Sequence, residues 1–281
     1  MKTKAIRKFR EKLAADVPVY GLWVTLESPA ITEMAVALGL DWVVIDAEHS
    51  HLDWKDIVEH IRATVRSDTV AFVRLVERDT GLIKRALDIG ADGVAAPWID
   101  SAEDLQELIC DSRYPPAGRR GVGGDRATVW GQCFGEHTQE ANEHVLVLPM
   151  IENVTVVDEM PAMCQLDGAE AFFFGPADFS ATAGHVGQWE GPGVAEHILD
   201  LKDTMRAAGK HAGVIATSIE DLHRRLEQGF RMIALGTDVS MLLGSLHTML
   251  DAAGRDRKPA TSLDPADGQA ITKVQPCPPK T

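Results

Sequence analysis

The stretch "TVAFVRLVERDTGLIKRALDIGADGVAAPWI" occupies residues 69–99 and decides the fold. Two apolar runs, 69–75 and 93–99, flank a segment, 80–90, whose apolar residues recur with helical spacing. Both runs are continuously hydrophobic rather than alternating, which is typical of strands in a parallel sheet that is covered on both faces. The stretch therefore predicts a strand, a helix and a second, parallel strand.

The same rhythm continues in both directions along the chain. Several predicted helices end in a glycine just before the next strand, which is a common helix C-terminal signal; these are Gly39, Gly90, Gly209 and Gly229. Further strands are predicted at 20–26, 42–47, 144–152, 169–175, 211–217 and 230–237, and helices at 29–39, 52–66, 154–164, 192–209 and 239–253, with two more opening at Ser101 and Ser218.

Eight strand–helix pairs in roughly 250 residues favour an α/β fold of the (β/α)8 TIM-barrel type. The rival is a doubly wound open sheet, but no G-x-G-x-x-G follows the first strand. Residues 1–16 predict an amphipathic N-terminal helix, and the Pro-rich, polar residues 254–281 predict a tail outside the core. We therefore expect one barrel domain, 1–253, and a C-terminal tail, 254–281.

Composition excludes several classes of function. The 281 residues include 42 acidic and 28 basic side chains, and the formal charge of −14 argues against general binding to nucleic acid or to an anionic membrane. No apolar run reaches membrane-spanning length, and the N-terminus has no apolar signal core. The four cysteines are scattered without a CxxC pair, so we expect reduced thiols and a cytoplasmic protein.

Charged residues gather where the predicted strands end. In "WVVIDAEHSH" (42–51) an apolar strand leads directly into Asp46, Glu48 and His49. Active sites of TIM barrels lie at these C-terminal strand ends, so the polar residues there are expected to face one site. The other strand ends carry Arg74, Trp98, Glu152, Asp178, Thr217 and Asp238. We interpret Asp238 as the start of the last helix and Trp98 as a wall residue.

The chemistry of this set favours a metal site, although each residue has a plainer interpretation. Glu152 and Asp178 are hard oxygen donors that suit Mg²⁺ or Mn²⁺, or they form a solvated acid pair. Arg74 is expected to bind an anion, either a ligand or Asp46 or Glu48. His49, oriented by Asp46, is a candidate general base, or it is a capping or hydrogen-bonded histidine. His51 is expected at the surface.

An absence is equally informative. An enzyme that forms a Schiff base needs a lysine in the site, and none of the eight predicted strands carries one near its C-terminal end; Lys210 precedes a strand. Carbanion chemistry at this site would therefore need a metal as electron sink.

Several segments resemble the HpcH/HpaI family of metal-dependent class II 2-oxo acid aldolases, which belong to the phosphoenolpyruvate/pyruvate-domain superfamily of TIM barrels. The similarity covers about 18–250, and D-x-E-H and G-P-A-D-F-S stand in the expected order. The segments are "GLWVTLESPAITEMAVALGLDWVVIDAEHS", "AFVRL", "PPAGRRGVG", "MIE" and "FFFGPADFSA".

The resemblance implies reversible aldol cleavage of a 4-hydroxy-2-oxo acid to an aldehyde and pyruvate, or a close analogue such as hydroxypyruvate, through a metal-stabilised enolate. It implies that Glu152 and Asp178 hold the divalent metal (Mg²⁺, Mn²⁺ or Co²⁺). Arg74 would stabilise the enolate oxygen, and His49, supported by Asp46, would be the base. Substrate contacts would come from Gly175, Pro176, Ala177, Trp23 and Thr217.

The sequence also departs from the family pattern. Met150 replaces a glutamine found in some relatives, and 123–144 differs from the expected sequence. A related carbon–carbon lyase or citrate-synthase-like enzyme on the same barrel fits the same site residues. A non-catalytic binding or assembly barrel predicts a degraded site, whereas the metal ligands, arginine and base are all present.

Two further features concern assembly. The Gly/Arg stretch 118–126 resembles an anion cradle, but it precedes a strand and should lie at the opposite end of the barrel, which favours a structural or inter-subunit role. Relatives exchange their last helix between subunits, so the resemblance implies a homo-oligomer, a hexamer built as a trimer of dimers.

Overall fold

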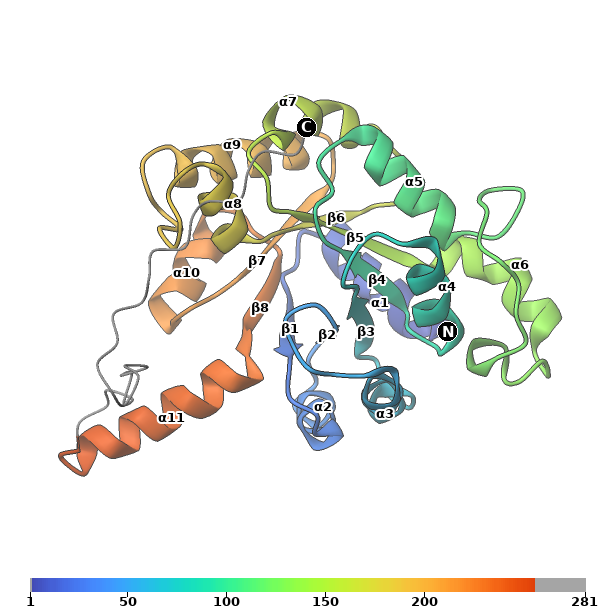
Figure 1. The fold of residues 1–281 in the computed structure, drawn as a ribbon, viewed down its shortest axis with the longest axis horizontal. Coiled ribbons are helices and arrows are strands. Elements are labelled where there is room, and N and C mark those ends of the chain that lie inside the picture. Colours follow the sequence, from blue (N-terminus) through green and yellow to red (C-terminus); the bar gives the residue numbers. More distant parts are fainter. Residues whose placement is uncertain (1, 256–281) are drawn as a thin grey trace, which may run out of the picture. The chain divides into compact units, whose positions relative to one another are not determined.

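The computed structural model describes residues 2–255, and its central feature is a closed barrel of eight parallel strands in the order β1 to β8 (Figure 1). The chain forms two compact units, Met1–Met241 and Leu242–Thr281, and the barrel lies in the first. The predicted TIM barrel is therefore confirmed. The strands are β1 Val19–Val24, β2 Trp42–Asp46, β3 Val70–Arg74, β4 Gly93–Ala96, β5 Leu146–Ile151, β6 Ala171–Phe174, β7 His211–Ile215 and β8 Met232–Thr237.

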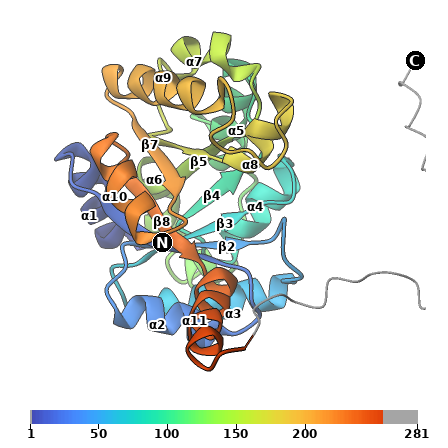
Figure 2. The ribbon, with the colours of Figure 1, turned by 90° about the vertical axis from the view of Figure 1, so that its left-hand side faces the viewer.

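Helices of the first unit, α2 to α5 and α7 to α10 among them, lie outside the ring of strands, as the two views at right angles show (Figures 1 and 2). Each predicted helix is present within a few residues of its expected bounds. The helices are α1 Thr3–Ala14, α2 Pro29–Ala37, α3 Trp54–Thr64, α4 Thr80–Asp88, α5 Ala102–Ser112, α6 Phe134–His144, α7 Val156–Met163, α8 Pro176–Thr182, α9 Val194–Ala207, α10 Ile219–Glu227 and α11 Asp238–Ala252, with a short 3-10 turn at Arg126–Thr128.

The local signals acted as the sequence indicated. The Ser101 and Ser218 side chains accept hydrogen bonds from the Asp104 and Asp221 N–H groups and cap α5 and α10. The glycines that end α2, α4, α9 and α10 all have positive φ, a conformation that glycine adopts without steric cost. Helices α6 and α8 were not predicted, because neither shows a long apolar period.

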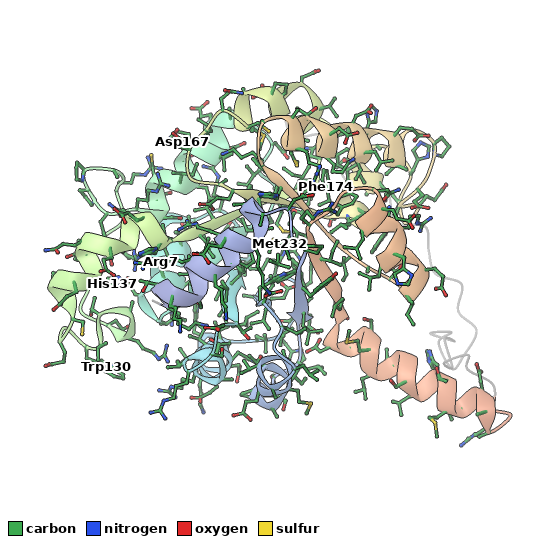
Figure 3. All side chains as sticks on the ribbon, turned by 180° about the vertical axis from the view of Figure 1, so that it is seen from behind. Arg7, Trp130, His137, Asp167, Phe174 and Met232 are labelled. Carbon is green, nitrogen blue, oxygen red and sulfur yellow. The ribbon has the colours of Figure 1, made fainter. Side chains whose placement is uncertain are left out.

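Two layers of apolar side chains hold the barrel. One fills its interior and includes Trp42, Phe72 and Met232; the other lies between the strands and the outer helices. In Figure 3, Phe174 and Met232 lie among the strands, whereas Trp130 and His137 lie near α6. The interior is thus a packed core, as in other TIM barrels.

Helix α1 packs onto the interior cluster at the N-terminal end of the barrel. Its apolar face, Ala5, Ile6, Phe9 and Leu13, is buried. The rings of Phe9 and Phe72 lie 6.1 Å apart, edge to face. The predicted amphipathic helix is therefore confirmed, and its apolar face covers the end of the barrel away from the candidate site.

Strands β1 and β2 approach closely within the barrel, which closes where β8 pairs with β1. Gly21 pairs with Trp42, and a Cβ atom at Gly21 would lie 2.1 Å from the Trp42 ring. Only glycine permits this contact, since real Cβ atoms do not approach a ring this closely.

The Gly/Arg stretch 118–126 is tied to neighbouring helices. The buried Arg120 lies 2.7 Å from Asp88 of α4 and over the Tyr114 ring, with its guanidinium carbon 4.4 Å from the ring centroid. Arg119 pairs with Asp111 of α5, and Arg126 donates to the Ile89 carbonyl. These contacts support the structural interpretation of this stretch.

Three of the cysteines, Cys110, Cys133 and Cys164, are free thiols; Cys277 and most of the predicted tail, 254–281, lie outside the described residues. Within 2–255, no helix is long and apolar enough to span a membrane.

Candidate active site

A cavity of about 320 Å³ opens where the strands end, and it collects most of the residues that the sequence singled out. Its walls come from the ends of β1, β2, β3, β5, β6, β7 and β8, from the first turn of α8 and from the loop that holds Trp189. The predicted residues that line it are Trp23, Asp46, His49, Arg74, Glu152, Gly175, Pro176, Ala177 and Asp178.

Asp46 organises the turn that follows β2. Its Oδ1 accepts the backbone N–H groups of Glu48, at 2.9 Å, and of His49, at 3.1 Å. Its Oδ2 accepts the Trp23 indole N–H at 2.7 Å. Asp46 therefore fixes the backbone of His49; its contribution to the orientation of the imidazole stays a prediction.

Arg74 lies among three carboxylates. Its Nη2 is 2.7 Å from Glu48 Oε2 and 2.8 Å from Glu152 Oε1, and its Nη1 is 3.4 Å from Asp46 Oδ2. The guanidinium is buried and lies 5.6 Å from the centroid of the Trp23 ring. A single positive charge thus faces three acidic groups, so the site carries an excess of negative charge when all three are ionised.

The ionisation of Glu48 reflects its burial first and the neighbouring carboxylates second. Burial raises the pKa of its carboxyl to about 7, with Glu152 and Asp46 adding to the rise and Arg74 opposing it. Burial also raises the pKa of Glu152, again against Arg74. Two carboxyl groups at this end of the barrel, Glu48 after β2 and Glu152 after β5, are therefore harder to ionise than usual, and a bound cation would relieve that cost.

Glu152 and Asp178 make a donor set that fits a divalent cation. Glu152 is 1% exposed, and the Asp178 carboxylate makes no hydrogen bond or ion pair with any residue from 2 to 255. A Cβ at Gly175 would lie 2.7 Å from Glu152 Cγ, so the glycine leaves room for the glutamate. The described residues contain no group of three or more His, Cys, Asp or Glu side chains placed to hold a metal. Two carboxylates leave coordination positions for waters or a substrate.

The backbone after β4 also holds Glu152. The Trp98 N–H donates to Glu152 Oε2 at 2.9 Å, and Trp98 has a φ of +53°. A bulky residue in this region stores strain of about 1–3 kcal/mol, a feature common at functional sites. The Trp98 side chain is exposed and does not line the cavity. What reaches the site is therefore its amide, not the side-chain wall expected from the sequence.

His49 lies at the mouth of the cavity. Its side chain is 62% exposed, and its Nε2 is 3.8 Å from Glu48 Oε1. An exposed imidazole beside a cavity is accessible to a substrate and to solvent protons. This placement is compatible with proton transfer, the role for which the sequence marked His49.

The remaining predicted residues differ in whether they can contact a ligand in this cavity. The Gly175 N–H donates to the Ile151 carbonyl, so among the three residues 175–177 only the Ala177 amide is left for a ligand, because proline has no N–H. Thr217 lines a neighbouring cavity, and its N–H and hydroxyl both donate to Asp221. Asp238 begins α11, as expected, and accepts the Thr25 and Leu26 N–H groups.

No lysine lines the cavity. Lys210, which immediately precedes β7, donates to the carbonyls of Leu166 and Ala169 at the opposite end of the strands. Among residues 2–255, the lysine nearest in sequence to a cavity strand thus lies at the wrong end of that strand to form a Schiff base in this cavity.

Some cavity residues carried no sequence signal. Trp189 lies in a glycine-rich loop, where no period marks it. Ile215 and Phe173 belong to apolar strands and could not be told from core residues. Met150, noted only as a departure, also lines the cavity, together with Thr25, Phe174 and Thr237.

Residues 19–244 match the family model of HpcH/HpaI aldolase/citrate lyase, which covers the whole barrel. The chain belongs to this family. The family resemblance seen in the sequence and the expected enzyme class, a carbon–carbon lyase of aldolase type, are thereby confirmed.

Aldolase/citrate lyase relatives resemble nearly the whole chain. A hydroxypyruvate/pyruvate aldolase of Pseudomonas aeruginosa is 35% identical over 252 residues, which cover 89% of this chain and 92% of that protein. A 4-hydroxy-2-oxovalerate aldolase of Rhodococcus jostii is 35% identical and covers 84% of this chain and 92% of its own length.

Solved structures agree in fold. A family member from Burkholderia cenocepacia superposes with a TM-score of 0.84 at 32% identity, covering 88% of this chain and 99% of that one. A citrate synthase superposes with a TM-score of 0.76 at 27% identity, covering 87% of this chain and 97% of that one. The barrel of this family therefore carries more than one carbon–carbon bond chemistry.

Proposed function

We propose that the protein is a divalent-metal-dependent aldolase that cleaves a 4-hydroxy-2-oxo acid reversibly to an aldehyde and pyruvate or hydroxypyruvate. One observation carries the proposal: Glu152 and Asp178 share a cavity with Arg74 and His49, and no lysine lines it. The names of the relatives, hydroxypyruvate/pyruvate aldolase and 4-hydroxy-2-oxovalerate aldolase, support the donor.

Glu152 and Asp178 would hold the cation, which we expect to be Mg²⁺, Mn²⁺ or Co²⁺. Bound there, it would polarise the keto oxygen of the donor and stabilise negative charge on that oxygen. The unpaired Asp178 carboxylate and the buried, hard-to-ionise Glu152 support this assignment.

The side chains around the cation would share the remaining work. Arg74 places a buried positive charge beside Glu152, where it would stabilise the developing enolate oxygen. His49, at the mouth, would remove the donor's methyl proton in synthesis and return it in cleavage. Asp46 would keep His49 in place through its backbone, and the Ala177 amide would bind the donor carboxylate.

The apolar walls would bind the rest of the donor. Trp23 lies against Phe173, with ring centroids 5.1 Å apart, and its indole N–H is held by Asp46. Such a fixed aromatic wall would exclude water from the carbanion. Thr217, one cavity away, is then better placed for a second substrate than for the donor.

Exchange of the pyruvate methyl protons into D₂O, followed by NMR, tests this function without an acceptor aldehyde. We expect exchange that stops with EDTA and returns with added Mn²⁺, Mg²⁺ or Co²⁺. Exchange that persists without metal, or covalent trapping of pyruvate by borohydride, would exclude the metal-dependent class.

A citrate-synthase-like activity is the second candidate, because a citrate synthase shares the fold at 27% identity. It would use the same enolate but a different electrophile. An assay that offers an aldehyde and oxaloacetate in turn, each with the same donor, separates the two activities. A non-catalytic barrel predicts no exchange at all.

We also propose a homo-oligomer, a hexamer by family resemblance, that works in the cytoplasm. Helix α11 presents Leu242, Leu246 and Met249 at spacings of four and three residues, and all three are exposed. One apolar stripe of this kind favours contact with a second chain. Light scattering of the wild type and of Leu246→Asp tests the assembly, and a monomeric wild type would contradict it.

A further inference from the structure

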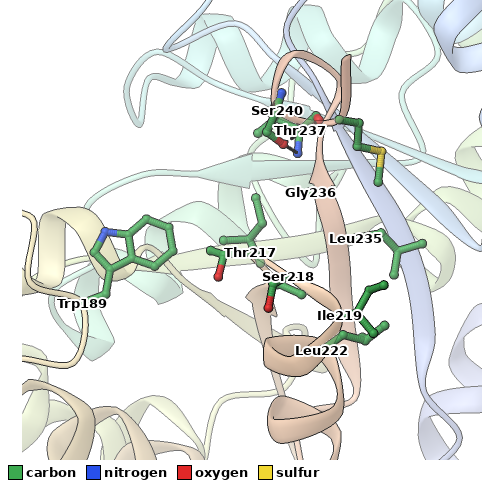
Figure 4. Close-up of a pocket in the computed structure, with 12 residues that line it drawn as sticks. Trp189, Thr217, Ser218, Ile219, Leu222, Leu235, Gly236, Thr237 and Ser240 are labelled. Carbon is green, nitrogen blue, oxygen red and sulfur yellow. Dashed lines mark hydrogen bonds between the residues drawn. The ribbon is translucent and has the colours of Figure 1, made fainter. Parts of the chain in front are cut away.

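Two adjoining cavities lie at the end of the barrel away from the candidate active site. The active-site cavity and its neighbour lined by Thr217 (Figure 4) lie where the strands end. The adjoining pair lies beside helix α1, where β2 and β3 begin. One, of about 420 Å³, lies between α1 and the turns at 39–41 and 66–69. The other, of about 460 Å³, lies between the start of α1 and residues 65–68. Both have 66–68 in their walls, and we call them together the basal cavities.

Basic side chains dominate the walls of the basal cavities. The charged lining residues among 2–255 are Lys2, Lys4, Lys8, Lys12 and Arg66, and Asp41 and Asp68. The chain as a whole has a formal charge of −14. The charge of these walls is therefore opposite in sign to that of the protein, and a positive cleft of this kind attracts anions.

Three of the wall cations have a carboxylate partner. Lys8 and Lys12 pair with the two wall aspartates. Lys2 Nζ lies 3.0 Å from Oδ2 of the buried Asp92, and the Lys2 backbone N–H donates to Oδ1 of the same residue at 3.1 Å. These contacts tie α1 to the start of the strands, so the walls are held in place before any ligand binds.

Lys4 and Arg66 have no such partner. Neither side chain makes a hydrogen bond or an ion pair with any residue from 2 to 255, and both line the larger basal cavity. The pKa of the Asp68 carboxyl is lowered, chiefly by its hydrogen bond with Lys8, and the charges of Lys4 and Lys2 add to the effect. The walls thus carry two unpaired positive charges, which a single dianion would neutralise.

The turn that follows α3 adds donors suited to a phosphoryl group. The Arg66 guanidinium is a planar fork that can bind two oxygens of one anion. The backbone N–H groups of Arg66 and Asp68 make no hydrogen bond within residues 2–255, whereas the Ser67 N–H and hydroxyl both donate to the Thr64 carbonyl. A phosphoryl dianion has three acceptor oxygens and two charges on one centre, so it can use more of these donors than one carboxylate can.

A large polyanion fits these walls less well than a small one. Nucleic acids and anionic membranes bind extended basic surfaces, whereas this chain has 42 acidic against 28 basic side chains. An acidic residue, Glu11, is exposed on α1 itself. A small anion that enters the cavities meets the lysines and the arginine without facing the acidic remainder of the surface.

We propose that the basal cavities bind a small phosphoryl dianion, inorganic phosphate or a phosphate ester, through Arg66 and Lys4. The site lies at the opposite end of the barrel from Glu152 and Asp178, and it needs neither a metal nor a 2-oxo acid. It is separate from the proposed aldolase function and is tested without catalysis.

Calorimetric titration of the full chain with inorganic phosphate and with glycerol 3-phosphate tests the site. The protein is first freed of metal with EDTA, so that no cation at Glu152 and Asp178 binds the anion. At pH 8 and low salt we expect saturable binding that weakens as NaCl is added. Tighter binding of one probe identifies free phosphate or an ester as the source of the phosphoryl group. Succinate, also a dianion, should bind at least about tenfold more weakly, because its charges lie on separate carboxylates.

Charge-removing substitutions locate the binding. Arg66→Gln and Lys4→Gln should each weaken phosphate binding by at least about tenfold, the usual cost of a lost charged hydrogen bond, and Arg66→Lys should recover part of the loss. Arg62→Gln is the matched control, because Arg62 is an exposed arginine of α3 that pairs with Glu59 and lines neither basal cavity. It should bind phosphate as wild type does. Thermal midpoints close to wild type will show that each variant is folded.

Three results would overturn the site. They are the absence of saturable binding of either phosphate probe to wild type, binding of succinate as tight as that of phosphate, and equal weakening in Arg62→Gln and Arg66→Gln. Pyruvate proton exchange is measured separately, in the presence of metal, so failure of the basal site leaves the proposed function standing. Failure of the exchange leaves the phosphate titrations equally unaffected.

Discussion

The Arg74 Nη2 atom lies 2.8 Å from Glu152 Oε1, so the arginine binds the same carboxylate that we assign to the metal. The other oxygen of Glu152 is bound by the Trp98 amide. One buried carboxylate is thus fixed from two sides before any ligand arrives. A carboxylate held in this way needs little reorganisation to bind a cation, which is the condition for electrostatic stabilisation in a preorganised site.

Arg74→Lys should lower the rate of pyruvate proton exchange by about 10²–10³-fold, the usual cost of losing one oxyanion donor. A lysine keeps the charge but not the planar fork that reaches Asp46 and Glu152 together. A second variant, Arg74→Ala, tests the metal site separately. Its affinity for Mn²⁺, measured by calorimetry, should not weaken, because the carboxylates of Glu152 and its neighbours no longer pair with the arginine guanidinium. Loss of Mn²⁺ binding in that variant would show that Arg74 shapes the metal site itself.

His49→Ala should lower the exchange rate by about 10²–10⁴-fold, the range typical of a general base. The imidazole is exposed and the fold does not depend on it, so the thermal midpoint should stay close to wild type. Mn²⁺ affinity should also stay close to wild type. His51→Ala, at a neighbouring exposed histidine, is the control. Equal exchange rates in the two variants would remove His49 from the proton-transfer step.

Gly175→Ala should weaken Mn²⁺ binding by at least about tenfold. The new Cβ would lie 2.7 Å from Glu152 Cγ and 2.8 Å from Glu152 Oε1, so the carboxylate must move. Gly135→Ala is the matched control, because no atom lies within 4 Å of its added Cβ and its φ is not positive. Calorimetric titration of Mn²⁺ into both variants decides the matter. Wild-type affinity in Gly175→Ala would mean that Glu152 is not a ligand.

His137→Gln should make the protein less sensitive to acid. Burial lowers the pKa of His137 from its usual 6.5 to about 4, and its Nε2 lies 3.3 Å from the Tyr114 hydroxyl. The unfolded chain takes up a proton near pH 6.5 that the folded protein resists. Stability from this group is therefore complete above pH 6.5 and is lost as pH falls from 6.5 towards 4.

Thermal midpoints measured between pH 7.5 and pH 5 check this prediction. The drop on acidification should be smaller in His137→Gln than in wild type, whereas the exposed His51→Gln should follow wild type. Burial also lowers the pKa of other histidines, so part of the wild-type drop should persist; these are His60, His144 and His211. An unchanged drop in His137→Gln would show that its neutral ring does not stabilise the fold.

The sequence predicted the barrel and the strand-end residues because both follow from regular periods. Continuous apolar runs such as 42–45 have one simple solution, a buried parallel strand, and the charged residue after such a run must lie at the strand's end. The site carboxylates and Arg74 were found by this rule alone. Their convergence in one cavity is then a consequence of barrel closure.

The contributions of Trp98 and Trp189 could not be predicted, because both residues lie in irregular segments. Trp98 was predicted to contribute its side chain, but its amide is what contacts Glu152, because a positive φ turns the backbone inwards. A positive φ at Trp98 could not be predicted from the residue type, because tryptophan rarely adopts it. Trp189 follows two glycines in a loop without a period, and the loop is held beside the cavity by the ion pairs of Glu190 with helix α10.

The packed interior and helix α1 occupy one end of the barrel, while the candidate active site and the cavity beside it occupy the other. This separation has an evolutionary consequence. Residues that line these cavities at the strand ends can change without disturbing the packing of the interior and of helix α1 at the other end. Sequence change in a lineage, or a laboratory library confined to these lining positions, can therefore vary the walls of the cavities while the packed interior stays intact.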